Sequence, residues 1–217
     1  MWGREDFWKK FGNFLRNPKP QCPNPNQTPN PKSQTPKTIV SVGRLVPWKG
    51  FNVLVEIMQE LPEWKLVIIG DGPEYNNLKS QISLLRQGFE GQANYKLQNQ
   101  ITLTGAISRE SVLEYLRTSE VFVLNTSFES FSYQIVEAMA VGIPIVATSI
   151  GNISEIVRDG VDGILVEPNN KKSIINAIKK ISDNPEFRSS IIESAMQRSK
   201  EFSIEKTLNN LVLILKK

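Results

Sequence analysis

The 217-residue chain contains no histidine and a single cysteine, Cys22. Without histidine, this polypeptide alone cannot supply a histidine general base, a Ser-His-Asp triad or an imidazole metal ligand. One cysteine cannot form a disulfide within the chain, which fits a reducing compartment. No Cys-x-x-Cys or Asp-x-Asp pair is present either, so we expect no metal site.

Long apolar stretches are also missing from the chain. No run approaches the roughly 20 apolar residues that cross a bilayer as a helix. The first fifteen residues lack the continuous apolar core that a signal peptide has. Together with the cysteine usage, these features predict a cytoplasmic location.

Positive charge is concentrated near the N-terminus. Residues 1–37 hold seven Lys or Arg against two acidic residues, whereas the other 180 residues hold 19 basic and 20 acidic side chains. The formal net charge of +4 therefore belongs to this first segment. Because a folded domain binds nucleic acid through a basic face, we expect no nucleic-acid partner.

The composition divides the chain into three parts. Residues 17–37 hold seven of the thirteen prolines and predict an extended Pro/Asn-rich linker. This linker separates an N-terminal segment, residues 1–16, from the part that can form a core, residues 38–217. The third part is therefore the expected domain.

Residues 1–16 have the pattern of a short amphipathic helix. Large apolar residues recur at helical spacing between Lys and Arg residues, namely Phe7, Trp8, Phe11, Phe14 and Leu15. One interpretation is peripheral contact with the anionic inner face of a membrane. The alternative is a helix that packs on a partner protein, or the remnant of a larger chain.

Strand and helix patterns alternate from residue 38 onward. The expected strands are 38–43, 65–70, 101–105, 121–125, 144–149 and 163–167. The expected helices are 51–61, 73–87, 108–119, 131–141, 152–158, 171–183, 185–201 and 203–216, with a loop at 88–99. Such alternation connects strands through right-handed crossovers. We therefore predict an α/β fold, a single Rossmann-like domain with a parallel sheet and helices on both faces, and ligand-binding loops at the carboxyl ends of the strands.

Two acidic residues, Glu129 and Glu137, flank the start of the helix expected at 131–141. Eight steps of helix span about 12 Å, roughly the reach of a sugar diphosphate. One carboxylate could accept hydrogen bonds from sugar hydroxyls and the other from a ribose. The backbone N–H groups between them, around 130–132, lie at a helix start and attract anions.

The loop after the first strand, GRLVPWKGF (43–51), carries a glycine and two cations. Gly43 permits a tight turn and close approach of a ligand. Arg44 presents a planar set of donors that fits phosphate oxygens, and Lys49 adds a nearby point charge. The alternative is a surface Arg and Lys beside an ordinary turn.

Two further glycine loops follow the next strands. IGDGPE (69–74) begins like the dinucleotide motif G-x-G-x-x-G, but Tyr75 stands where the third glycine belongs, so a hydride-transfer cofactor is not expected. In TGAIS (104–108), backbone groups of Ala106 and Ile107 could meet the edge of a base. Either loop can equally be a simple connection, the first one leading into a helix with Pro73 at its first position.

Taken in order, four segments resemble the C-terminal, donor-binding half of a GT-B glycosyltransferase of family 4. They are GRLVPWKG (43–50), IGDGPE (69–74), LTGAIS (103–108) and ESFSYQIVEAMAVGIPIVAT (129–148). The resemblance covers roughly residues 38–200. It implies binding of a nucleotide-diphosphate sugar and transfer of the sugar with retention, without a required metal ion.

The resemblance also implies roles for individual residues. It places Arg44 and Lys49 on the diphosphate, Glu129 on the donor sugar hydroxyls and Glu137 on the ribose. The remaining expected contacts are Gly43 at the phosphate turn, Gly70 and Ile107 near the base, and the N–H groups of Phe131 and Ser132 on the phosphate or sugar.

The chain departs from the family pattern in two respects. Ser130, Ser132 and Asn152 stand where the family usually has glycine, which narrows the sugar end of the site. In addition, only about forty residues precede the first strand, whereas a complete GT-B enzyme has a second, acceptor-binding domain. We therefore expect either a donor half that needs an acceptor domain or partner protein, or a non-catalytic binding module. A sugar-nucleotide epimerase relative fits the glutamate pair less well.

Overall fold

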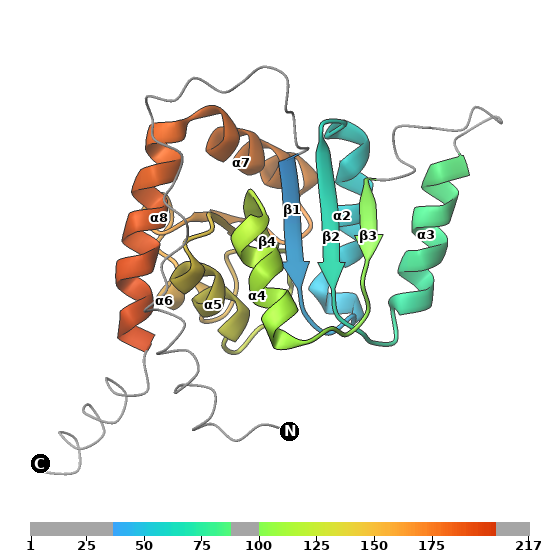
Figure 1. Cartoon of the computed structure of the whole chain (residues 1–217), viewed down its shortest axis with the longest axis horizontal. Helices are drawn as coiled ribbons and strands as arrows, with labels where there is room; N and C mark the ends of the chain where they lie inside the picture. The colour runs from blue at the N-terminus through green and yellow to red at the C-terminus, as the bar shows by residue number, and fades with distance from the viewer. Residues whose placement is uncertain (1–36, 88–99, 203–217) are drawn as a thin grey trace, which may run out of the picture.

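The computed structural model describes residues 37–87 and 100–202, which form one three-layer α/β domain. Six parallel strands build a single sheet in the order β3-β2-β1-β4-β5-β6 (Figure 1). The strands are β1 (Lys37–Val42), β2 (Trp64–Ile69), β3 (Ile101–Leu103), β4 (Val121–Leu124), β5 (Ile145–Thr148) and β6 (Ile164–Val166). This confirms the predicted fold class and parallel sheet.

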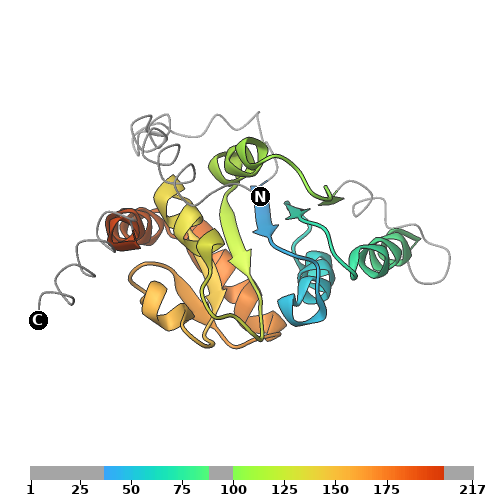
Figure 2. The same cartoon turned by 90° about the horizontal axis from the view of Figure 1, so that it is seen from below.

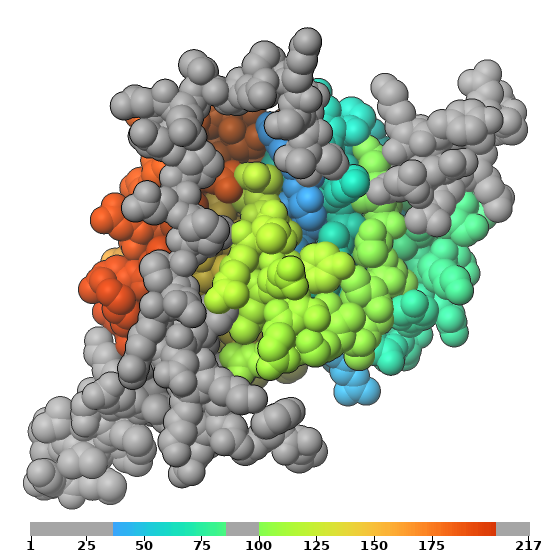
Figure 3. Space-filling model, in the orientation of Figure 1, coloured from blue at the N-terminus to red at the C-terminus, as the bar shows by residue number. Residues whose placement is uncertain are grey.

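Helices cover both faces of the sheet (Figure 2). The α-helices are α2 (Phe51–Ile57), α3 (Tyr75–Gln87), α4 (Arg109–Thr118), α5 (Tyr133–Val141), α6 (Ile153–Ile156), α7 (Lys171–Asp183) and α8 (Pro185–Ser199). Short 3-10 turns occupy η1 (Pro47–Lys49), η2 (Met58–Glu60) and η4 (Lys200–Phe202). Seen from the front, α4 covers the sheet between α8 and α3 (Figure 3).

Alternate strand residues feed two separate cores. On β1, Ile39 packs with α2, α3 and α7, whereas the next residue, Val40, packs with α4, α5 and α6. Helix α8 contributes Ile191 to the first core and Ala195 to the second. Successive side chains of a strand point to opposite faces, so near-continuous apolar strands such as VFVL serve both cores at once.

Several boundaries differ from the prediction. Helix α3 begins at Tyr75 and not at residue 73, and α5 begins at Tyr133 and not at residue 131. The predicted strand at 38–43 begins one residue earlier, at Lys37. The predictions for residues 1–36, 88–99 and 203–216 lie outside the described residues.

The part of the chain that the structure describes contains no helix with the length and apolarity needed to cross a bilayer. Over the same residues, no group of three or more His, Cys, Asp or Glu side chains is placed to hold a metal ion.

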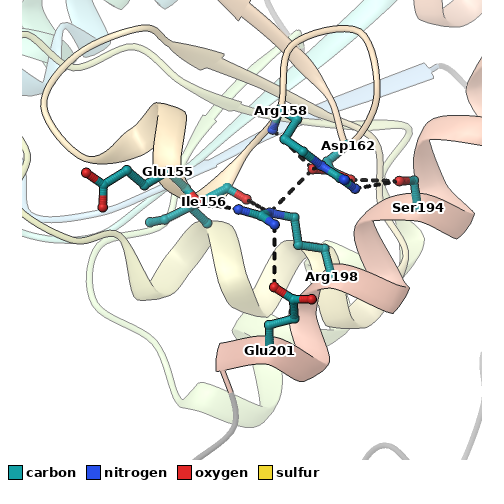
Figure 4. A network of polar contacts seen from close by, with 7 residues as sticks. All are labelled: Glu155, Ile156, Arg158, Asp162, Ser194, Arg198 and Glu201. Atoms are coloured by element: carbon teal, nitrogen blue, oxygen red, sulfur yellow. Dashed lines mark hydrogen bonds and ion pairs between the residues drawn. The ribbon is translucent and has the colours of Figure 1, made fainter. Parts of the chain in front are cut away.

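One buried carboxylate, Asp162, ties the segment before β6 to α8 (Figure 4). It accepts hydrogen bonds from Arg158 Nε at 2.7 Å, from Arg158 Nη2 at 2.8 Å and from Ser194 Oγ at 2.7 Å. Arg198 Nε lies 3.5 Å from the same carboxylate and donates to the Ile156 carbonyl at 2.8 Å. Helix α8 is thereby fixed to α6 and to the loop that follows α6.

Burial raises the pKa of Asp162, but the hydrogen bonds from Arg158 and Ser194 outweigh burial and leave the pKa below its ordinary value. The carboxylate is therefore ionised in the folded domain at neutral pH. The negative charge of Asp162 balances the guanidinium groups of Arg158 and Arg198, which both lie beside it.

We predict that Asp162→Asn lowers the free energy of unfolding at neutral pH by about 2–3 kcal/mol, because charge-assisted hydrogen bonds are lost. Since the folded pKa of Asp162 is depressed, its contribution is full above the unfolded pKa and disappears as the pH falls through the folded pKa. Urea unfolding across an acidic pH series should show the wild type and variant converging. Asp183→Asn, at an exposed carboxylate that ends α7, is the control; an equal effect of both substitutions would contradict the assignment.

Candidate functional site

The candidate site lies at the carboxyl edge of the sheet. Because all six strands are parallel, the loops that follow β1, β2, β3, β4 and β5 leave from the same edge, at the bottom of Figure 1. The strand order reverses direction between β1 and β4, which are neighbours in the sheet. Ligands of open α/β sheets bind in the crevice at such a switch point. The loops after β1 and β4 are therefore the centre of the site.

Glycines allow the loops after β1 and β2 to touch through their backbones. The Gly43 N–H donates to the Ile69 carbonyl and the Leu45 N–H to the Asp71 carbonyl, both at 3.0 Å. Gly70 has φ +145°, and a Cβ atom there would lie 1.8 Å from the Gly43 carbonyl oxygen. The two glycines predicted from sequence are thus brought together, and no side chain fits between them.

The loops after β1 and β4 are joined by hydrogen bonds to the main-chain carbonyls of Trp48 and Gly50. The carbonyl of Trp48 accepts from the Ser127 N–H at 2.7 Å and from Thr126 Oγ1 at 3.1 Å. Asn125, buried at the end of β4, donates from Nδ2 to the Gly50 carbonyl at 2.9 Å. These bonds set the distance between the two loops independently of any ligand.

An ion pair connects the same two loops through their side chains. Lys49 Nζ donates to Glu129 Oε2, and the two side chains are only 12% and 14% exposed. Opposite charges that are largely shielded from solvent attract each other more strongly than the same charges in bulk water. Lys49 has three donors, so it can hold Glu129 and still donate to an anion in the crevice.

The loops after β1 and β4 also carry Arg44 and several aromatic side chains. Arg44 is exposed, and no ion pair engages it within residues 37–87 and 100–202. Phe128 is 70% exposed, and Phe131 and Tyr133 lie edge to face with ring centroids 5.0 Å apart. These two loops and the start of α5 therefore expose one further cation and several aromatic rings.

Ser132 is the N-cap of α5. Its Oγ accepts from the Ile135 N–H at 3.4 Å and donates to Gln134 Oε1 at 3.2 Å. The cap explains why α5 begins two residues later than predicted, because Ser132 keeps an extended backbone. Phe131 and Ser132 precede the helix, and Glu137 lies about one turn into it.

Glu137 pairs with a residue that the sequence interpretation did not consider. Its Oε1 accepts from Arg109 Nη2 at 2.9 Å, and the glutamate side chain is 14% exposed. Burial raises the pKa of Glu137 above its ordinary value, and the charge and hydrogen bond of Arg109 offset only part of that rise. Arg109 is the first residue of α4 and follows the loop that contains Ile107.

The structure brings together Gly43 with Gly70 and Lys49 with Glu129, while Glu137 pairs with Arg109. The side chain of Ile107 is partly buried and packs against the core that includes α4 and α5. Sequence reasoning missed Arg109 and Asn125. The signals were an arginine directly after the N-cap Ser108, and an asparagine ending an otherwise apolar strand.

Two solved structures share the fold of the described domain. The crystal structure of Anabaena HepE in complex with UDP and glucose superposes with a TM-score of 0.71 at 20% identity, over 100% of this chain and 53% of that one. The C-terminal domain of a glycosyl transferase group 1 family protein from Francisella tularensis superposes with a TM-score of 0.67 at 21% identity, over 94% of this chain and 95% of that one. The described domain therefore has the α/β fold of GT-B glycosyltransferases.

The chain belongs to the glycosyl transferases group 1 family, whose sequence model matches residues 24–198. An uncharacterized glycosyltransferase of Methanocaldococcus jannaschii is 30% identical over 168 residues, covering 76% of this chain and 44% of the relative. The 2-deoxystreptamine N-acetyl-D-glucosaminyltransferase of Niallia circulans is 31% identical over 180 residues, covering 81% of this chain and 43% of the relative. The chain spans less than half the length of these curated relatives.

We predict that Gly70→Ala destabilises the domain far more than Gly160→Ala. Both glycines have positive φ, but a Cβ atom at Gly160 meets nothing within 4 Å. Gly160→Ala should therefore cost only the backbone strain of about 1–2 kcal/mol, and Gly70→Ala about 1–3 kcal/mol more for overpacking. Urea unfolding measures both. Equal losses would show that the backbone of Gly43 can move away.

Proposed function

We propose that the chain is the donor-binding part of a retaining glycosyltransferase of the family 4 type, which transfers a hexosyl group from a nucleotide-diphosphate sugar. The observation that carries the proposal is the Lys49–Glu129 pair at the switch point of the sheet. It places a cation for an anionic group beside a carboxylate that accepts hydrogen bonds from hydroxyls. A sugar diphosphate presents these two kinds of group next to each other.

Arg44 and Lys49 would bind the diphosphate in this scheme. Negative charge grows on the leaving diphosphate as the bond from the anomeric carbon to its phosphate oxygen breaks. Cations beside that oxygen then interact more strongly in the transition state than in the ground state. The Phe131 and Ser132 N–H groups, just before α5, would add neutral donors to the same anion or to the sugar.

The two glutamates would bind the two ends of the donor. Glu129 would accept from hydroxyls of the transferred sugar, and Glu137 from the ribose. The nucleobase would lie against the backbone near Gly70 and Ile107, and Gly43 would let the phosphate approach the loop after β1. No metal ion or other cofactor is part of this scheme.

Acceptor binding would be supplied by another domain, either elsewhere in a longer protein or in a partner chain. Two observations favour this: the domain superposes on about half of Anabaena HepE, and the chain covers less than half of its curated relatives. A cytoplasmic location with peripheral membrane contact through residues 1–16 also belongs to the proposal and rests on sequence alone.

The second candidate function is a non-catalytic module that binds a nucleotide sugar or a partner protein. Ser132 favours it, because its Oγ accepts from the Ile135 N–H and thereby occupies one donor of the helix start. Glycine, usual at this position in the family that the sequence resembles, would leave that donor for the ligand. A sugar-transfer assay separates the two functions.

We predict that Glu129→Gln weakens binding of a nucleotide sugar more than binding of the bare nucleotide. Hydrogen bonds to a charged acceptor contribute about 1.5–3 kcal/mol, so the sugar-dependent part of the affinity should fall about tenfold or more. Calorimetry with UDP-, GDP- and ADP-sugars and the matching nucleotides measures this difference. Glu167→Gln, at an exposed carboxylate after β6, is the control. Equal losses for both ligands would refute the sugar-binding role.

We predict that the chain binds its nucleotide sugar but releases nucleoside diphosphate from it only when an acceptor-binding domain is added. The second domain is needed because these loops provide donor contacts alone. Chromatography of the released nucleotide measures turnover, with Lys49→Ala as the inactive control. Binding without release, even with the added domain and its acceptor, would contradict the enzyme and support the module.

A further inference from the structure

Arg109 occupies a position that local helix chemistry disfavours. It is the first residue of α4, directly after the N-cap Ser108, whose Oγ accepts from the Ser111 N–H at 3.2 Å. A helix N-terminus carries a partial positive charge, so a cation there is less favourable than a neutral residue. Residues that break a local preference are concentrated at functional or strained sites.

Glu137 is equally unusual on α5. The residues around it on that helix are almost all buried and apolar, namely Ile135, Val136, Ala138, Met139, Ala140 and Val141. A carboxylate in such surroundings stays ionised only if it is paired or hydrogen-bonded. Arg109 is that partner, because its Nη2 donates to Glu137 Oε1 at 2.9 Å.

The pair leaves part of the carboxylate available. Within the described residues, the hydrogen bond from Arg109 engages Oε1, and no hydrogen bond engages Oε2 of Glu137. An ionised carboxylate has about four lone-pair positions, so one hydrogen bond from Arg109 leaves room for two vicinal hydroxyls. Two neighbouring hydroxyls are what a ribose presents.

We infer that Arg109 is a positioning residue that holds the Glu137 carboxylate in the orientation that binds the ribose hydroxyls of the donor. This inference rests on the proposed function and adds to it a residue that acts through Glu137 and touches no substrate. The start of α4 follows the loop expected to meet the base. The Arg109–Glu137 pair thus links the base-binding loop to the ribose-binding helix.

A purely structural tie between α4 and α5 makes a different prediction. It would change stability and leave the recognition of individual hydroxyls unaltered. The positioning role instead affects the ratio of affinities for a ribonucleotide and its 2′-deoxy form. This ratio cancels all contacts that the two ligands share, including those with the phosphates and the base.

The test measures calorimetric dissociation constants for UDP, GDP and ADP, and then for the 2′-deoxy form of whichever binds best. The wild type should prefer the ribonucleotide by about tenfold, the effect of one hydrogen bond to a charged acceptor. Glu137→Gln should lose most of that preference, and Arg109→Gln should lose it to a similar extent. Arg109→Lys, which keeps the charge, should restore part of it.

Two further variants separate the explanations. The double variant Arg109→Gln with Glu137→Gln should show no larger loss of preference than either single variant, because both act on one contact. Arg117→Gln, in the last turn of the same helix, is the matched control and should retain the wild-type ratio. Melting temperatures of all variants identify any that fail to fold, and Arg109→Lys then provides the comparison.

The outcomes distinguish this inference from the proposed function. If Arg109→Gln weakens the ribonucleotide and the deoxynucleotide equally, the positioning role is overturned while nucleotide binding stands. Additive losses in the double variant would mean that Arg109 contacts the ligand directly, which also overturns it. If the wild type binds none of the three nucleotides, the proposed function itself fails, and the inference fails with it.

Discussion

The reversal of strand order between β1 and β4 is the constraint on which the rest of the site depends. To one side of this point the chain builds β2 and β3, and to the other side β5 and β6. The connecting helices therefore lie on opposite faces of the sheet, and the loops after β1 and β4 leave neighbouring strands at the same edge. Lys49 and Glu129 belong to these two loops, so topology alone brings together side chains that are eighty positions apart.

Two kinds of contact then fix the loops at this edge. Gly43 and Gly70 let the backbones of the loops after β1 and β2 touch, with no room for a side chain between them. Asn125 and the Trp48 carbonyl make the hydrogen bonds that hold the loops after β1 and β4 together. Charge is added to this frame by Lys49, Glu129 and Arg44, and the frame does not depend on them.

Much of the fold could be predicted from sequence because its signals are local. Alternating strand and helix patterns predicted the parallel sheet, and the helix expected at 108–119 corresponds to α4, which begins at Arg109. Helix starts were less predictable, since Ser132 and Pro73 each fit more than one position near a helix end. The start of α5 shows the difficulty, because only the extended backbone of Ser132 reveals that the helix begins at Tyr133.

The candidate site was predictable only in part, for a physical reason. A glycine or a cation that directly follows a strand can be recognised from a few neighbouring residues. Gly43, Arg44 and Lys49 could therefore be selected as candidate site residues. The partner of Glu137 could not, because Arg109 is 28 positions away and their contact depends on how α4 and α5 pack. The roles of these residues remain predictions, since the contacts show placement and not ligand.

Two uncharged side chains, Asn125 and Asn169, connect the loops after β4 and β6 through hydrogen bonds. The N–H of Asn169 donates to Asn125 Oδ1 at 2.9 Å, and its own Oδ1 accepts from Asn125 Nδ2 at 3.0 Å. Asn169 has φ +60°, a conformation that asparagine tolerates better than most residues. Amide groups carry no net charge and do not titrate near neutrality, so high salt and moderate changes of pH should leave the Asn125–Asn169 hydrogen bonds intact. The loops after β4 and β6 should therefore keep their arrangement at salt concentrations that screen the charges of Lys49 and Arg44.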